Sequence, residues 1–189
     1  VVYDSKVDRD LWSNFGDYTD LFFTFVDMPD DDSLEGVMQY KDMMLGGLLL
    51  GSMPLFCVVD NNNRLADKDE ITLEDLNGEN VVILSEGWGK NAALLKKIIE
   101  KEVKDVDLQV LPYFGVEIYN ECANDGLIIL GAIDFAYVHP FITARPMPKY
   151  KELYSAYGLT YLYPPSAPVE KLINVIKEII SEDKDIINF

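Results

Sequence analysis

Short apolar runs alternate with polar turns along most of the chain, and this pattern predicts a series of buried strands. The run 21–26 is nearly continuous in apolar and β-prone residues and stops at Pro29 and three aspartates. A strand with two apolar faces belongs inside a sheet that helices cover. The segment 33–50 fits either a helix or an extended chain. Further strands are expected at 53–60, 81–84, 106–114 and 126–130.

Apolar positions at helical spacing predict helices between these strands. Leu94, Leu95, Ile98 and Ile99 mark one amphipathic helix over 90–103. Further helices are expected at 8–15, 116–125 and 167–180.

A very short helix is also predicted after the polar loop that follows the strand at 53–60. Thr72 supplies an N-cap hydroxyl, Asp75 stands three residues later, and Gly78 can close the helix. Strands therefore alternate with helices through most of the chain, which predicts an α/β fold with a largely parallel sheet.

The chain is strongly acidic. It carries 33 Asp and Glu against 16 Lys and Arg, for a formal net charge of −17, which would repel a phosphate backbone. We therefore expect no nucleic-acid binding by this chain itself, and solubility is the simplest reason for the charge. No apolar run reaches the length of a membrane span, and the first residues have no export-signal pattern, so we expect a cytoplasmic protein without a membrane partner.

Few residues offer cofactor or metal chemistry. The two cysteines, Cys57 and Cys122, are expected to be buried free thiols in a reducing compartment, with one disulfide or one reactive thiol as alternatives. His139 is the single histidine and is expected to be structural. We expect no metal and no cofactor.

The stretch "SEGWGKN" at 85–91 is the first candidate for a binding site. It follows a predicted buried strand and starts a helix, and in an α/β unit ligands bind at such turns. Ser85 can hydrogen-bond, while Gly87 and Gly89 let a backbone approach a ligand. An ordinary glycine-rich helix start explains the same residues equally well. The spacing fits neither a phosphate-binding loop nor a dinucleotide fingerprint.

Two carboxylates raise the possibility of catalysis. Glu86 and Glu117 both follow predicted strands and could face one cleft as an acid–base pair. Nothing in the sequence fixes their separation, and no nucleophile motif accompanies them. We therefore expect a protein that is not an enzyme.

The succession "MPLFCVVDNNNRLADKDEITLEDLNGENVVIL" at 53–84 resembles the central part of the effector-binding domain of LysR-type transcriptional regulators. Arg64, Leu65 and Ala66 stand where that family has "HPLA", so the usual histidine and proline are missing. The likeness continues through "NECANDGLIILGAIDFAYVHP" and "YGLTYLYPPSAPVEKLINVIKEI", covers roughly residues 18 to 180, and is weakest before Met53.

The resemblance implies a bilobed fold like that of type 2 periplasmic-binding proteins, in which two α/β lobes are joined by two crossover segments. The first lobe would comprise 1–57 and 150–189, with its start truncated, and the second 58–149. A small-molecule effector would bind between the lobes. The residues that the resemblance carries to this cleft are Thr24, Ser85, Glu86, Gly87, Gly115, Val116, Glu117 and Gly131.

The family also implies a function. We expect an effector-sensing regulatory domain that acts as a homodimer and reaches DNA only through a winged helix-turn-helix domain that this chain lacks. Glu86 favours an effector that carries an amine, because an unpaired carboxylate facing an anion would be penalised. A solute-binding protein of the same fold and a lyase or dehydratase on a similar fold are the alternatives.

Overall fold

The computed structural model describes residues 20–27, 37–40, 43–131 and 139–182. These residues fall into two compact units, one within 3–53 and 156–189 and the other within 54–155. The chain therefore passes from one unit to the other twice, at 53–54 and at 155–156. The α/β architecture with two sheets agrees with the predicted fold class. The lobe boundaries that the resemblance implies stay a prediction.

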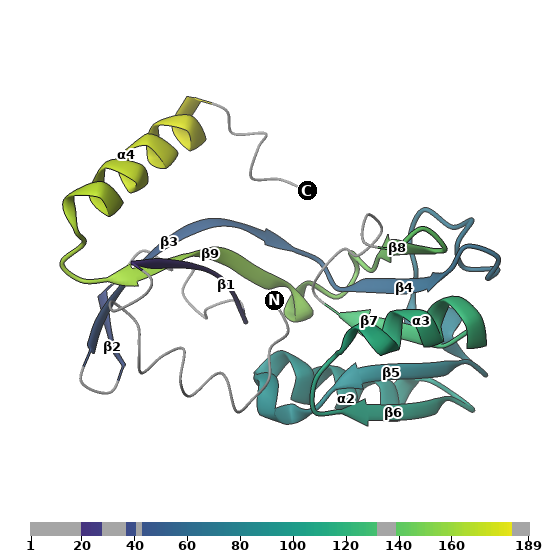
Figure 1. Ribbon diagram of the computed structural model, residues 1–189. Coiled ribbons are helices and arrows are strands. Elements are labelled where there is room, and N and C mark those ends of the chain that lie inside the picture. The colour runs from purple at the N-terminus through teal and green to yellow at the C-terminus, as the bar shows by residue number, and fades with distance from the viewer. Residues whose placement is uncertain (1–19, 28–36, 41–42, 132–138, 183–189) are drawn as a thin grey trace. The chain divides into compact units, whose positions relative to one another are not determined.

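The first unit is built on a four-stranded sheet in the order β1, β9, β3, β2 (Figure 1). Its helix α4 (Ala167–Glu182) buries Val169 and Ile173 against Leu48 and Leu159 of the sheet. Strand β2 runs antiparallel to β3. The predicted strand at 21–26 is confirmed, and the ambiguous segment 33–50 contains two strands. The strands of this sheet are β1 (Leu21–Asp27), β2 (Val37–Tyr40), β3 (Met43–Met53) and β9 (Ser155–Leu162).

The second unit contains a five-stranded sheet in the order β6, β5, β7, β4, β8. Strand β5 is parallel to both β6 and β7, but β4 is antiparallel to β7 and to β8. The expectation of a largely parallel sheet therefore holds for β6, β5 and β7 but is wrong for the pairing of β4 with β7 and β8. A buried strand is a run of apolar residues whether its neighbours are parallel or antiparallel, so the sequence does not show the direction. The strands are β4 (Phe56–Asp60), β5 (Asn80–Leu84), β6 (Asp107–Leu111), β7 (Ile128–Gly131) and β8 (Ile142–Pro146).

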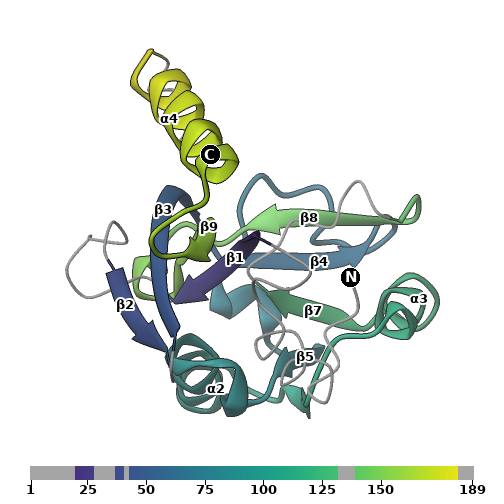
Figure 2. The ribbon, with the colours of Figure 1, turned by 60° about the vertical axis from the view of Figure 1, so that its left-hand side comes forward.

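Two helices cover the two faces of this sheet (Figure 2). Helix α2 (Lys90–Glu102) packs Leu95 and Ile99 on the side chains of one face, and α3 (Val116–Asp125) packs Ile118 and Cys122 on those of the other. Successive strand residues alternate between the two cores, as the pleat requires. Burying each large aliphatic side chain contributes about 1.5–3 kcal/mol, so the two cores supply much of the stability of this unit.

Most of the helix predictions in the described residues hold closely. Helices α2, α3 and α4 occupy the predicted segments, whereas the helix expected at 8–15 lies outside the described residues. The short helix after Thr72 is a 3-10 turn, η1 (Leu73–Leu76). Two further 3-10 turns are η2 (Glu86–Trp88) and η3 (Lys151–Leu153).

A carboxylate holds the start of η1, as the capping prediction requires. An Asp75 carboxylate oxygen accepts hydrogen bonds from the backbone N–H and the hydroxyl of Thr72 at 3.0 and 3.1 Å. Its other oxygen lies 2.5 Å from Nζ of Lys68. Gly78 follows with a φ of +76°, the left-handed conformation that favours glycine after a helix.

Replacing Gly158 by alanine is expected to destabilise the first unit. A Cβ at this position of β9 would overlap the backbone carbonyl oxygen of Leu48 in β3, and backbone cannot move aside as a flexible side chain can. The expected loss is about 1–3 kcal/mol in the free energy of unfolding, measured by urea denaturation. Gly131→Ala is the matched control, since its Cβ would meet Phe114 at an ordinary 3.8 Å. Equal stability of the two variants would contradict the close approach of β9 to β3.

The Asp75 cap is expected to contribute stability that is lost at acid pH. Partial burial tends to raise the pKa of Asp75, but hydrogen bonds from Lys68 and Thr72 outweigh it and hold the pKa below its ordinary value. The contribution is therefore complete above about pH 3.9, the pKa of an unfolded aspartate, and is lost as pH falls through the lower folded value.

The test compares the chain with Asp75→Asn by urea unfolding at a series of pH values. The wild type should be the more stable at neutral pH. The difference in the free energy of unfolding between the two proteins should close below about pH 3.9, the ordinary pKa of aspartate. Asp67→Asn, an exposed aspartate in the same loop, is the control and should show no such gap. A gap for Asp75→Asn that is constant with pH would refute the role of the charge.

Candidate functional site

Three parallel strands of the second unit end at the same edge of the sheet. Leu84 of β5 lies opposite Leu111 of β6, and the pairing of Val82 with Ile129 brings the end of β7 at Gly131 to the same level. The carboxyl edge of parallel strands is where α/β sheets bind ligands. Seven of the eight residues predicted from the sequence lie at the end of one of these strands or between that end and the first turn of the next helix: Ser85, Glu86, Gly87, Gly115, Val116, Glu117 and Gly131.

Backbone and indole hydrogen bonds join the turn after β5 to the turn after β6. The N–H of Ser85 donates to the carbonyl of Leu111 at 2.8 Å. The indole Nε1–H of Trp88 donates to the carbonyl of Pro112 at 2.5 Å, while 40% of the Trp88 surface stays exposed. These bonds hold the two turns together and leave an aromatic surface at their margin.

The two glycines of this turn differ in whether the structure requires glycine. Gly89 has a φ of +142° at the start of α2, a conformation that other residues rarely adopt. Gly87 is exposed, and the nearest atom to its missing Cβ is Oγ of Ser85 at 3.8 Å. Gly89 is therefore required by the backbone, whereas Gly87 leaves open space beside Ser85.

The carboxylate of Glu86 in η2 pairs with a lysine of the following helix, α2. Its Oε1 lies 3.2 Å from Nζ of Lys96, with 57% of the Glu86 side chain exposed. An exposed ion pair of this kind contributes little stability. It does compensate the charge of Glu86, which removes the reason for expecting an amine on the effector.

Helix α3 begins at Gly115, and its first turn carries the other carboxylate. A Cβ at Gly115 would overlap Oε2 of Glu117, so this carboxylate lies against the helix start, where the helix dipole favours negative charge. Val116 between them is 65% exposed. Glu86 and Glu117 thus have different neighbours: Lys96 lies beside Glu86, and the start of α3 lies beside Glu117.

The remaining predicted residues are less informative. Gly131 is half-buried, and its Cβ would stand 3.8 Å from Phe114, so space alone does not require glycine there. Thr24 lies in β1 of the first unit, and its side chain falls outside the described residues. Its approach to the other seven residues stays a prediction.

Asn91 has a structural contact that the sequence does not reveal. It occupies the first turn of α2, and its Nδ2 donates to the carbonyl of Tyr154 at 2.8 Å. The two residues are 63 positions apart in the chain, so no local pattern indicates the bond. The side chain holds the start of α2 to the segment in which the chain leaves the second unit.

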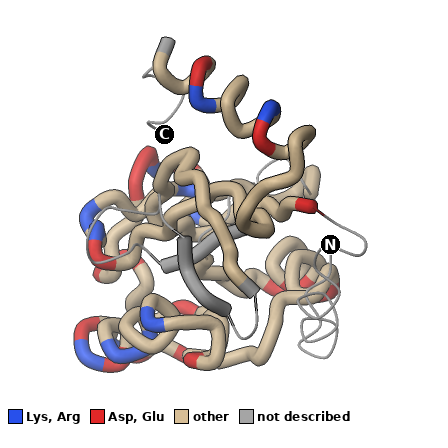
Figure 3. The backbone as a smooth tube through the Cα atoms, turned by 90° about the vertical axis from the view of Figure 1, so that its left-hand side faces the viewer, with Lys and Arg blue, Asp and Glu red and all other residues tan. Residues whose placement is uncertain are grey.

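The described part of the chain mixes charged side chains of both signs. Its described residues include no group of three or more His, Cys, Asp or Glu placed to hold a metal ion. Basic positions are interspersed with acidic ones along the tube in Figure 3, and the pairs with carboxylates include Arg64 with Glu79, Lys68 with Asp75, Lys96 with Glu86 and Lys101 with Glu102. Within the same residues, no helix is long and apolar enough to cross a membrane.

The two cysteines lie on opposite faces of the five-stranded sheet. Cys57 belongs to the core under α2, and Cys122 of α3 belongs to the core on the other face. Both are free and buried, as predicted. Burial, with a smaller effect of Cys122, raises the pKa of Cys57 well above its ordinary value, and burial raises the pKa of Cys122 to about 12. Neither thiol is therefore a thiolate at neutral pH.

Comparison with known proteins gives the fold its name. No model of a protein family matches the chain, and no curated protein matches it in sequence. Among solved structures, the CcmR regulatory domain of Synechocystis PCC6803 in complex with 2-PG matches with a TM-score of 0.59 at 12% identity, over 92% of this chain and 78% of that one. The predicted resemblance is confirmed at the level of the fold.

Two further structures support the same assignment. The reduced OxyR regulatory domain of Pseudomonas aeruginosa has a TM-score of 0.57 at 16% identity, over 92% of this chain and 78% of that one. The BenM effector-binding domain with its effector benzoate has a TM-score of 0.58 at 13% identity, over 95% and 77%. The chain thus has the fold of the regulatory domains of LysR-type regulators.

Both thiols are expected to be unreactive in the folded protein. With a thiol-specific disulfide reagent at neutral pH, neither Cys57 nor Cys122 should react on the timescale on which both react in concentrated urea, because burial excludes the reagent and keeps the thiols protonated. Cys57→Ser and Cys122→Ser would assign any residual signal. Rapid reaction of either thiol in the folded chain would contradict its position in the core.

Proposed function

We propose that this chain is the small-molecule-sensing domain of a LysR-type transcriptional regulator. The observation that carries the proposal is the fold, which matches such domains over more than nine tenths of the chain. Two of the matched structures are named with small molecules, 2-PG and benzoate. An effector would act by binding one conformation of the domain more tightly than another.

The proposed effector site contains Thr24, Ser85, Glu86, Gly87, Gly115, Val116, Glu117 and Gly131. Its support is the common edge on which seven of these residues lie and the two helices that start there. The N-cap residues of α2 and α3 are both glycines, so neither contributes a capping side chain to the first turn of its helix. Such helix starts favour anions.

We therefore propose an effector with a carboxylate or phosphate group. The pairing of Glu86 with Lys96 favours an anion over the amine that the sequence suggests. Glu117 would compete with the effector at the start of α3, because its carboxylate already lies there.

The wider setting of the domain is part of the proposal. The chain spans 56% of full-length OxyR and of full-length BenM, so a DNA-binding domain would belong to the rest of a regulator. We propose a cytoplasmic homodimer. Two of the matched OxyR structures are named as the reduced and the oxidised form, so a response to oxidation is a second candidate function. The burial of Cys57 and Cys122 on opposite faces of the sheet disfavours it here.

The effector site is tested by a thermal-shift screen with aliphatic, aromatic and phosphorylated carboxylates. A ligand at a hundred times its Kd stabilises a protein by about 2.7 kcal/mol, which raises the Tm of a domain of this size by roughly 5–10 °C. Ser85→Ala should weaken binding of the best ligand by about 2–10-fold, because it removes one hydrogen bond. Glu117→Gln should strengthen binding, because it removes a competing charge.

The control is Glu121→Gln, an exposed glutamate farther along α3 that should leave the affinity unchanged. The site would be wrong if a ligand bound Ser85→Ala and Glu117→Gln with wild-type affinity. The absence of any shift across the screen would count against effector sensing altogether.

A further inference from the structure

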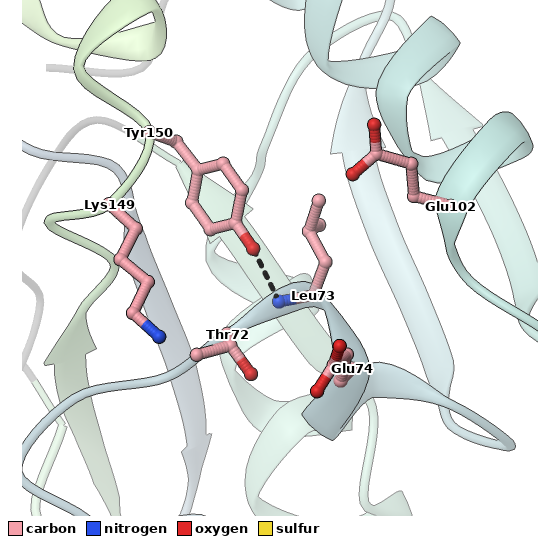
Figure 4. A pocket seen from close by; sticks show the side chains of 6 residues that line it. All are labelled: Thr72, Leu73, Glu74, Glu102, Lys149 and Tyr150. Carbon is pink, nitrogen blue, oxygen red and sulfur yellow. Dashed lines mark hydrogen bonds between the residues drawn. The ribbon is translucent and has the colours of Figure 1, made fainter.

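The second unit carries a groove that none of the predicted effector residues lines. It has a volume of about 320 Å³ and is open to solvent (Figure 4). Ligand sites for small molecules begin at roughly this volume. Three segments of one unit supply its walls: η1 with its N-cap, the last residue of α2, and the residues before η3. The lining residues are Thr72, Leu73, Glu74, Glu102, Lys149 and Tyr150.

The apolar floor of the groove is fixed by the core beneath it. Leu73 is 2% exposed and belongs to the same core as α2, and Tyr150 packs against that core. The hydroxyl of Tyr150 accepts a hydrogen bond of 2.9 Å from the backbone N–H of Leu73. A groove whose walls are already held in place loses little conformational entropy when a ligand binds.

One part of the groove favours a cation. Glu102 is the last residue of α2, where the free carbonyls of a helix end and its dipole are negative. Its partner is Lys101 at 3.7 Å, a side chain that is 80% exposed. Glu74 adds a second carboxylate, for which the described residues record no ion pair. An ammonium group would compensate this negative charge.

The opposite part of the groove favours an anion. Lys149 and Glu102 lie on opposite sides of Tyr150 in Figure 4. Among the described residues Lys149 forms no salt bridge, although two carboxylates line the same groove. Because the hydroxyl of Tyr150 accepts from Leu73, its own proton can be donated to a ligand. A carboxylate on the side of Lys149 would therefore meet an ammonium and a hydroxyl donor.

We propose that this groove is a second small-molecule site, which binds a zwitterion of the amino-acid type with its ammonium near Glu102 and Glu74 and its carboxylate near Lys149. Because charges of both signs line the groove, it suits a zwitterion better than a ligand with a single charge. The site does not depend on the proposed effector function, because no residue is shared between the two.

The test is an NMR titration of the isotope-labelled chain with glycine, β-alanine and γ-aminobutyrate, and with butylammonium and butyrate as singly charged probes. At least one zwitterion should shift the amide signal of Leu73, whose N–H is bonded to Tyr150, while the signals of Ser85 and Glu86 stay in place. Each singly charged probe should bind at least about fivefold more weakly, since it loses one charge-assisted contact.

Variants distinguish the groove from non-specific binding. Lys149→Gln and Glu102→Gln should each weaken the best zwitterion by at least about fivefold, whereas Lys151→Gln and Glu100→Gln, exposed neighbours outside the lining, should not. The proposal fails if no zwitterion shifts Leu73 at millimolar concentration, or if both lining variants bind like the wild type. Shifts at Ser85 and Glu86 without a shift at Leu73 would overturn this proposal and leave the effector site intact.

Discussion

The burial of β5 on both faces is the constraint on which the second unit depends. Val81 and Ile83 enter the core under α2, Val82 enters the core under α3, and all three are fully buried. A strand so placed needs a hydrogen-bonded neighbour on each edge, because an unpaired backbone group without water is costly. With β6 and β7 parallel on its two sides, the ends of three strands are aligned, and the candidate residues share one edge for this reason.

The sequence predicts the elements of this fold better than their directions. Buried strands are continuous apolar runs and helices repeat at 3.6 residues, so β5, α2 and α3 could be located closely. The direction of β4 depends on pairing with residues more than seventy positions away and leaves no local trace. The segment 33–50 was ambiguous because a strand such as β3, with small and aliphatic residues on both faces, has no period to detect.

The sequence predicts which elements the candidate residues lie between, but not the direction of their side chains. Ser85 and Gly115 could be placed at strand ends because the turns follow from the elements. Glu86 pairs with Lys96, one of several basic residues of α2, and no local pattern in the sequence singles out this partner. The groove beside Tyr150 was also hidden, since it joins three segments that only the folded chain brings together.

The bond between Asn91 and Tyr154 ties the candidate site to the path of the chain. Asn91 stands in the first turn of α2, directly after the turn that carries Ser85, and Tyr154 lies one residue before the second unit ends. The start of α2 therefore cannot shift without either breaking this bond or carrying the carbonyl of Tyr154 along. A single amide side chain thus makes the position of this turn and the point where the chain leaves the second unit depend on each other.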